Sequence, residues 1–151
     1  MKKILLLILI VLVAIQFVPV NRTNTPIDKN QNFVDIHKPP QEVETIIKNA
    51  CYDCHSNETK YPAYAYVAPI SWSVKHHINE GRGNLNFSTW AKYNADQKEH
   101  ILEECIETVR ERKMPMKAYV NFHEEAKLTE VQRNVLIGYF NQLRQNINRE
   151  N

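Results

Sequence analysis

The sequence predicts an all-α protein, and two observations favour this fold class. The 151 residues include only three glycines, and no Asn-Gly or Asp-Gly pair stands between alternating apolar runs, so the usual signals of β-hairpins are missing. Apolar side chains instead recur at helical spacing in several segments, and two of these segments begin with capping residues. We therefore expect one small helical domain.

The first twenty residues predict an export signal that remains as a membrane anchor. A short basic start, Met1-Lys2-Lys3, precedes an uncharged and mostly apolar run from Ile4 to Val20. The run is at the short end for a membrane-spanning helix, which needs about 17–25 residues, and longer than the apolar part of most cleaved signal peptides. No small-x-small cleavage triplet follows it, so we expect residues 1–20 to stay, with the basic start in the cytoplasm.

Residues 21–40 predict a flexible tether, because the segment is polar, contains three prolines and lacks apolar periodicity. The remaining residues, 41–151, are enough for one domain with one core. The formal net charge of +2 is too close to neutral to indicate nucleic-acid binding, and no basic stripe with interleaved aromatic residues is present.

Two helices are expected in the first half of the domain. Residues 42–49 have apolar side chains on one face and lead directly into Cys51. Residues 70–80 form the second helix, which we expect to end at Gly81 because glycine commonly follows the last helical residue.

Two longer helices are expected in the second half, and each begins with a capping box. Asn94 with Gln97 starts one of them, and Thr129 with Gln132 starts the other. The apolar positions of these two helices that we expect to face the core are Ile101, Leu102, Cys105, Ile106, Val109, Val131, Val135, Leu136, Tyr139, Phe140, Leu143 and Ile147.

The segment Cys51-Tyr52-Asp53-Cys54-His55 is a C-x-x-C-H pentapeptide, the attachment motif of c-type haem. Cys51 and Cys54 can form thioether bonds to the two vinyl groups of one haem, and His55 can then bind the iron through its imidazole. Bacteria attach haem to this motif outside the cytoplasm, in agreement with the export signal. We therefore expect one covalently attached haem c with its iron.

Other uses of a C-x-x-C pair explain fewer of these features. A closed zinc site needs four ligands, and the only other cysteine is Cys105, which lies on an apolar helical stripe and is expected to be a buried free thiol. A redox-active pair does not require His55 and usually stands at the start of a helix in a strand-rich fold. A zinc site, a redox pair and a structural disulfide stay open as alternatives.

Motifs on both sides of the pentapeptide resemble the bacterial haem-binding domain family, whose members are small exported domains with one c-type haem. The resemblance covers about Gln41 to Leu143 and implies a helical, c-type cytochrome-like domain that carries electrons. The motifs that carry it are Cys51-Tyr52-Asp53-Cys54-His55-Ser56-Asn57, Tyr61-Pro62, Ala68-Pro69-Ile70-Ser71-Trp72, His77, Gly81-Arg82, Leu85-Asn86-Phe87-Ser88, Trp90, Met114-Pro115, Tyr119, His123, Ala126 and Leu128-Thr129.

The second axial ligand of the iron is expected to be Met114. The residue after it, Pro115, fixes the backbone and donates no hydrogen bond, so the loop can be held rigidly over a haem face. A Met-Pro pair downstream of C-x-x-C-H also resembles the distal loop of many class I cytochromes c. The other candidates are an open site and the side chains of His76, His77, His100, Met116 and His123.

One residue near the motif has two interpretations, and the two residues inside it have one. Arg82 can pair with a haem propionate or remain a solvated surface arginine. Tyr52 and Asp53, which stand between the two cysteines, are expected to be spacers.

The expected function is one-electron transfer by a membrane-anchored domain on the outer, periplasmic side of the inner membrane. The expected partner is a cytochrome, a peroxidase or a respiratory complex, so the protein is expected to be an electron carrier and not an enzyme. The alternative is a haem sensor or peroxidase-like enzyme with an open or weakly held distal site, and a non-haem zinc or disulfide module is the third possibility.

Overall fold

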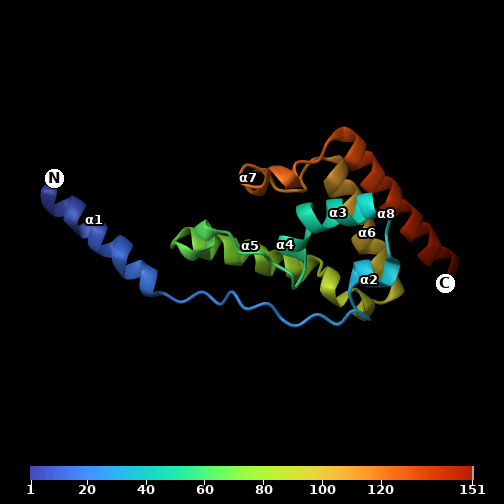
Figure 1. Ribbon diagram of the computed structural model, residues 1–151, viewed down its shortest axis with the longest axis horizontal. Helices are drawn as coiled ribbons and strands as arrows, with labels where there is room; N and C mark the ends of the chain where they lie inside the picture. The colour runs from blue at the N-terminus through green and yellow to red at the C-terminus, as the bar shows by residue number, and fades with distance from the viewer. Residues whose placement is uncertain (151) are drawn as a thin grey trace.

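The computed structural model describes residues 1–150, without the side chain of Glu150. Within this range every regular element is a helix, which confirms the expected all-α fold (Figure 1). The α-helices are α1 (Lys2–Ala14), α2 (Phe33–His37), α3 (Gln41–Ala50), α4 (Tyr52–His55), α5 (Ile70–Asn84), α6 (Ala95–Arg110), α7 (Lys117–Val120) and α8 (Glu130–Glu150). Four short 3-10 helices, η1 to η4, cover Ile15–Phe17, Ala63–Tyr66, Phe87–Lys92 and Glu124–Ala126.

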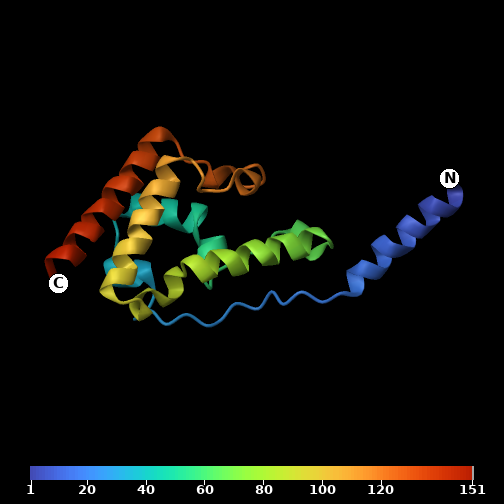
Figure 2. The same cartoon turned by 180° about the vertical axis from the view of Figure 1, so that it is seen from behind.

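The core lies where α6 and α8 pack along each other and α3 closes against α8. Both expected capping boxes are present, with Gln97 N donating to Asn94 Oδ1 over 2.9 Å and Gln132 N donating to Thr129 Oγ1 over 3.2 Å. From this body, α5 and the segment that carries α7 project toward the side of the molecule where α1 lies (Figure 2).

The helix that was expected to end at Gly81 continues to Asn84 as α5. Gly81 is therefore an interior helical residue, and its backbone φ is not in the left-handed region that a glycine at a helix end usually adopts. Its physical role lies in packing, because it faces the backbone of Cys54.

The segment 21–40 differs from a free tether in two respects. Residues 33–37 form α2, and Phe33 is completely buried, with its ring 5.0 Å from Phe87 and 5.0 Å from Trp90 between centroids. The preceding residues lie along the domain and are held by side chains: Arg22 Nε donates to Ala65 O over 2.8 Å, and Asn24 Nδ2 donates to Thr59 O over 2.9 Å. We call residues 18–31 the strap.

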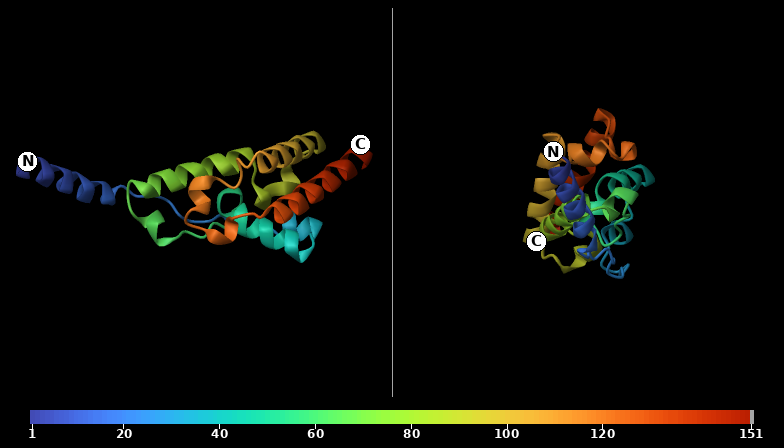
Figure 3. Two further views of the ribbon diagram at one scale, coloured as in Figure 1. Left: turned by 90° about the horizontal axis from the view of Figure 1, so that it is seen from above. Right: turned by 90° about the vertical axis from the view of Figure 1, so that its left-hand side faces the viewer.

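The expected membrane-spanning helix over residues 1–20 is not found. α1 ends at Ala14 after 13 residues and continues only as the 3-10 turn Ile15–Phe17. At about 1.5 Å per residue such a helix is roughly 20 Å long, against about 30 Å of hydrocarbon in a bilayer. In residues 1–150 no helix is both long and apolar enough to cross a membrane. α1 extends away from the rest of the protein (Figure 3). Its apolar side chains are exposed.

Candidate haem site

The C-x-x-C-H segment forms a tight turn directly after α3: Cys51 links the two helices, and Tyr52–His55 are α4. His55 N donates to Cys51 O over 2.9 Å, so the two cysteines and the histidine stand on one helical turn. Both thiols are unpaired. Burial raises the pKa of Cys51 to about 12 and that of Cys54 to about 11. Reactive redox thiols have lowered pKa values, so this environment does not favour a redox-active pair.

The imidazole of His55 is held in one tautomer. Its Nδ1 lies 3.2 Å from the carbonyl oxygen of Leu85, at the end of α5. A carbonyl can only accept a hydrogen bond, so Nδ1 carries the proton and Nε2 keeps its lone pair. Burial lowers the pKa of His55, which keeps the ring neutral. An oriented, neutral imidazole of this kind is what a metal ligand requires.

Three cavities surround this turn. The Cys51 cavity has a volume of about 380 Å³, and its walls include Cys51, His55 and Met114. The central cavity, about 220 Å³, is bordered by Cys54, His55 and Met114. The outer cavity, about 340 Å³, extends from Cys54 toward His123. The groups that a c-type haem needs, two thiols and a neutral imidazole, thus belong to residues that border adjoining cavities, and Met114 borders two of these cavities.

Met114 stands in a loop that is fixed from two sides. Its backbone N donates to Thr108 O over 3.1 Å, and its carbonyl accepts a hydrogen bond of 3.1 Å from Arg133 Nη1. The same Nη1 donates to Val109 O over 2.6 Å. The loop after α6 is therefore tied to both α6 and α8.

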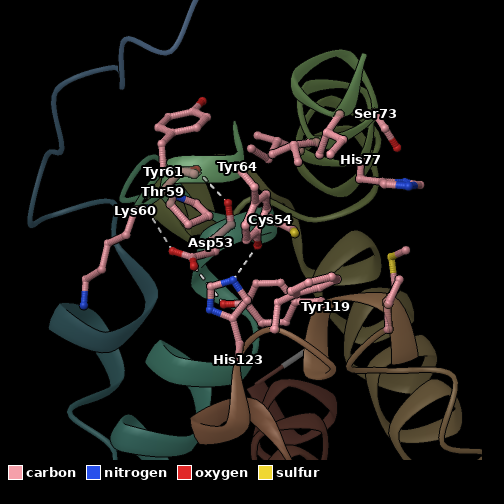
Figure 4. A pocket seen from close by; sticks show the side chains of 17 residues that line it. Asp53, Cys54, Thr59, Lys60, Tyr61, Tyr64, Ser73, His77, Tyr119 and His123 are labelled. Atoms are coloured by element: carbon pink, nitrogen blue, oxygen red, sulfur yellow. Dashed lines mark hydrogen bonds between the residues drawn. The ribbon is translucent and has the colours of Figure 1, made fainter. Parts of the chain in front are cut away.

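His123 lies apart from His55, on the wall of the outer cavity (Figure 4). Its Nε2 is 2.7 Å from the hydroxyl of Tyr64, its Nδ1 is 3.3 Å from a carboxylate oxygen of Glu125, and its ring stacks on Tyr119 at 4.1 Å. Both ring nitrogens of His123 thus have partners inside the protein.

The other candidate ligands are placed differently from one another. His77 and Met116 border both the central and the outer cavity, and in Figure 4 His77 stands on the α5 side of the latter. His76 and His100 are exposed and lie 3.3 and 3.6 Å from the carboxylates of Glu80 and Glu104.

Arg82 and Asp53 support the motif through contacts that the sequence did not indicate. Arg82 binds the protein itself: its Nε donates to Ser56 O over 2.7 Å, and one Nη donates to Thr59 Oγ1 over 2.9 Å. Asp53 is more than a spacer, because its carboxylate accepts hydrogen bonds from Tyr119 Oη at 2.7 Å and from Lys60 N at 2.9 Å. No local pattern indicates these partners, which come from distant parts of the chain.

Tyr52, the other expected spacer, belongs to the core. It is 2% exposed, its ring stacks on Phe87 at 5.4 Å, and its hydroxyl donates to Asn32 Oδ1 over 3.1 Å.

Cys105 borders the same cavity as Cys51, and burial raises its pKa. In the described part of the chain, no three His, Cys, Asp or Glu side chains are grouped so that they could hold a metal ion.

The family model of the haem-binding domain matches residues 10–142, which is most of the chain. No curated protein and no solved structure matches this chain. The match spans the C-x-x-C-H turn, all three cavities and the Met114 loop. The chain therefore belongs to the haem-binding domain family.

Proposed function

We propose that the protein attaches one c-type haem covalently through Cys51 and Cys54 and carries single electrons. The observation that supports this proposal best is the hydrogen bond from His55 Nδ1 to Leu85 O. It leaves the unprotonated Nε2 with a lone pair that can bind iron, on a residue that borders one cavity with Cys51 and another with Cys54. Haem supplies an iron that alternates between two oxidation states.

Met114 provides the second axial ligand in this proposal. It borders both cavities that His55 borders, whereas His123 borders neither of them. The nitrogens of His123 are already engaged with Tyr64 and Glu125. A thioether ligand closes the sixth position and favours the reduced iron, which suits an electron carrier better than an enzyme that must bind a substrate at the metal.

The protein acts outside the cytoplasm and exchanges electrons with a redox partner protein, a cytochrome, a peroxidase or a respiratory complex. The basic start and the apolar segment that follows it support export. After Lys2 and Lys3 the side chains of α1 are apolar and exposed, and an exposed apolar surface of this kind supports attachment of residues 1–20 to the periplasmic face of the inner membrane.

Covalent haem is tested by expressing the chain with a periplasmic haem-maturation system and staining a denaturing gel for haem. We expect a stained band of the mature mass, a sharply lower yield for Cys51→Ala and for Cys54→Ala, and normal staining for Cys105→Ser. The last variant is the matched control, because Cys105 borders the same cavity as Cys51 but lies outside the motif. Exported wild-type protein without stain would refute the proposal.

A further inference from the structure

We propose that Arg133 is a positioning residue that holds Met114 in place as the axial ligand. The inference deepens the proposed function and rests on its assignment of Met114. Arg133 does not border any of the three cavities, so it acts only through the backbone of the loop.

The loop between α6 and α7 needs such support because the turn that ends α6 has an arginine, Arg112, at a left-handed position where glycine is usual. Lys113 N donates to Thr108 O over 2.9 Å and Arg112 N donates to Val109 O over 3.2 Å, the two hydrogen bonds of a Schellman motif. The left-handed position of that motif, usually a glycine, is occupied by Arg112 with φ 58°. A side chain in this conformation costs about 1 kcal/mol, so the turn gains less from its own backbone than a glycine turn would.

Arg133 joins the two ends of this turn. A single nitrogen, Nη1, donates to Val109 O before the turn and to Met114 O after it, over 2.6 and 3.1 Å. The Arg133 side chain is 11% exposed, so both hydrogen bonds are largely shielded from water. Hydrogen bonds from a charged donor to a carbonyl are stronger than those between neutral groups. Arg133, a residue of α8, therefore fixes the distance between the last turn of α6 and Met114.

Both backbone groups of Met114 are held by hydrogen bonds. Its N–H binds Thr108 O, its carbonyl binds Arg133, and the next residue, Pro115, is buried and has no N–H. With both peptide groups fixed, the Cα–Cβ bond of Met114 keeps its direction, and the side chain borders the cavity that it shares with His55. Loss of Arg133 frees the carbonyl side of that arrangement.

The test compares Arg133→Met with Arg144→Met in the haem-loaded protein. Arg144 also lies on α8 and binds α6, where Nη2 is 2.9 Å from Glu103 and Nε contacts Glu99, so its loss weakens the same helix pair away from Met114. We expect Arg133→Met to keep covalent haem and helix content, to lose most of the sulfur-to-iron charge-transfer absorption, and to bind carbon monoxide about tenfold more tightly. Arg144→Met should change neither property.

Arg133→Lys keeps the positive charge without the planar fork and should lie between wild type and Arg133→Met. If Arg133→Met fails to fold, Arg133→Lys replaces it in the test. Hydrogen exchange at the amides of Lys113 and Met114 should then be faster in Arg133→Lys than in wild type. An unchanged absorption in both Arg133 variants, or an equal loss in Arg144→Met, would overturn the positioning role alone. If the wild type lacks the absorption, Met114 is not the ligand and the positioning role of Arg133 fails with it, whereas covalent attachment through Cys51 and Cys54 is decided separately by the haem stain.

Discussion

Gly81 of α5 and Cys54 of α4 are in direct backbone contact: a Cβ at position 81 would stand 2.7 Å from the Cys54 carbonyl oxygen and 3.2 Å from its Cβ. Side chains do not approach a carbonyl oxygen so closely, so the two helices can meet only because residue 81 is a glycine. The same contact keeps the end of α5, with Leu85 O, beside the imidazole of His55.

Gly81→Ala should therefore separate α5 from the haem-attachment turn. The Cys54 backbone cannot rotate away as the end of a flexible side chain could, so we expect a loss of about 1–3 kcal/mol in the free energy of unfolding and a lower haem content per protein. Urea denaturation and the haem-to-protein absorbance ratio measure the two effects. Gly83→Ala is the control, because a Cβ there meets nothing within 4 Å and alanine should stabilise the helix by up to about 1 kcal/mol. Equal behaviour of the two variants would show that the contact is unimportant.

Met114→Ala should open the sixth coordination position. We expect a lower reduction potential, loss of the sulfur-to-iron charge-transfer absorption and new affinity for carbon monoxide, with the haem still covalently bound. Redox titration and carbon monoxide difference spectra give these quantities. Met116→Ala, on the neighbouring wall, should keep the wild-type spectrum. Loss of the absorption in Met116→Ala or His123→Ala instead would reassign the ligand, and carbon monoxide binding by the wild type would favour a sensor or a peroxidase.

His37 should make the folded protein less stable at acidic pH. Burial, and to a lesser extent the charge of Lys98, lower the pKa of His37, and its Nε2 is buried without a hydrogen-bond partner among the described residues. Below the ordinary histidine pKa of 6.5 the unfolded chain binds a proton that the folded protein takes up only at lower pH, so the free energy of unfolding falls as the pH drops below 6.5.

His37→Phe tests this dependence, since a phenyl ring can take the place of the imidazole beside Phe33 and Trp90. We expect the melting temperature of the variant to fall less than that of wild type between about pH 7 and pH 5. His100→Gln changes an exposed histidine and should leave the pH dependence as it is. A His37→Phe protein with the wild-type dependence would show that other groups are responsible.

The mature protein should retain residues 1–20. Gln16 exchanges two hydrogen bonds with the peptide groups of Ala68, at 2.9 and 3.0 Å, so the N-terminal segment is joined to the domain and not only to the strap. We expect the chain to fractionate with membranes and its N-terminal peptide to appear in mass spectra of the purified protein. A soluble species that begins between Val20 and Asn24 would show that the segment is a cleaved signal peptide.

Features with a local cause could be predicted from the sequence, and those that depend on distant contacts could not. The capping boxes at Asn94 and Thr129 involve residues three positions apart, and the C-x-x-C-H motif lies within one turn. The end of α5 was misplaced because Gly81 serves a contact with Cys54, 27 positions earlier in the chain.

The helix α2 and the role of Arg133 were missed for related reasons. α2 has only five residues, too few for an apolar period to be visible, although Phe33 is at the centre of the aromatic core. Arg133 looks like one more cation on an amphipathic helix, and only the folded chain brings it to the carbonyls of Val109 and Met114.

The strap limits how the domain can be presented. A free coil of twenty residues has a root-mean-square span of about 25 Å and a broad distribution of lengths. Arg22 and Asn24 instead tie the strap to Ala65 and Thr59, and Arg82 holds Asn24 through a hydrogen bond of 3.0 Å while also binding the Ser56 carbonyl. The C-x-x-C-H turn therefore has one fixed orientation relative to η1 and does not move at the end of a flexible linker. In the proposed electron transfer, a redox partner would therefore have to be oriented toward this turn, and the fixed orientation, not the length of a flexible linker, would select the partner.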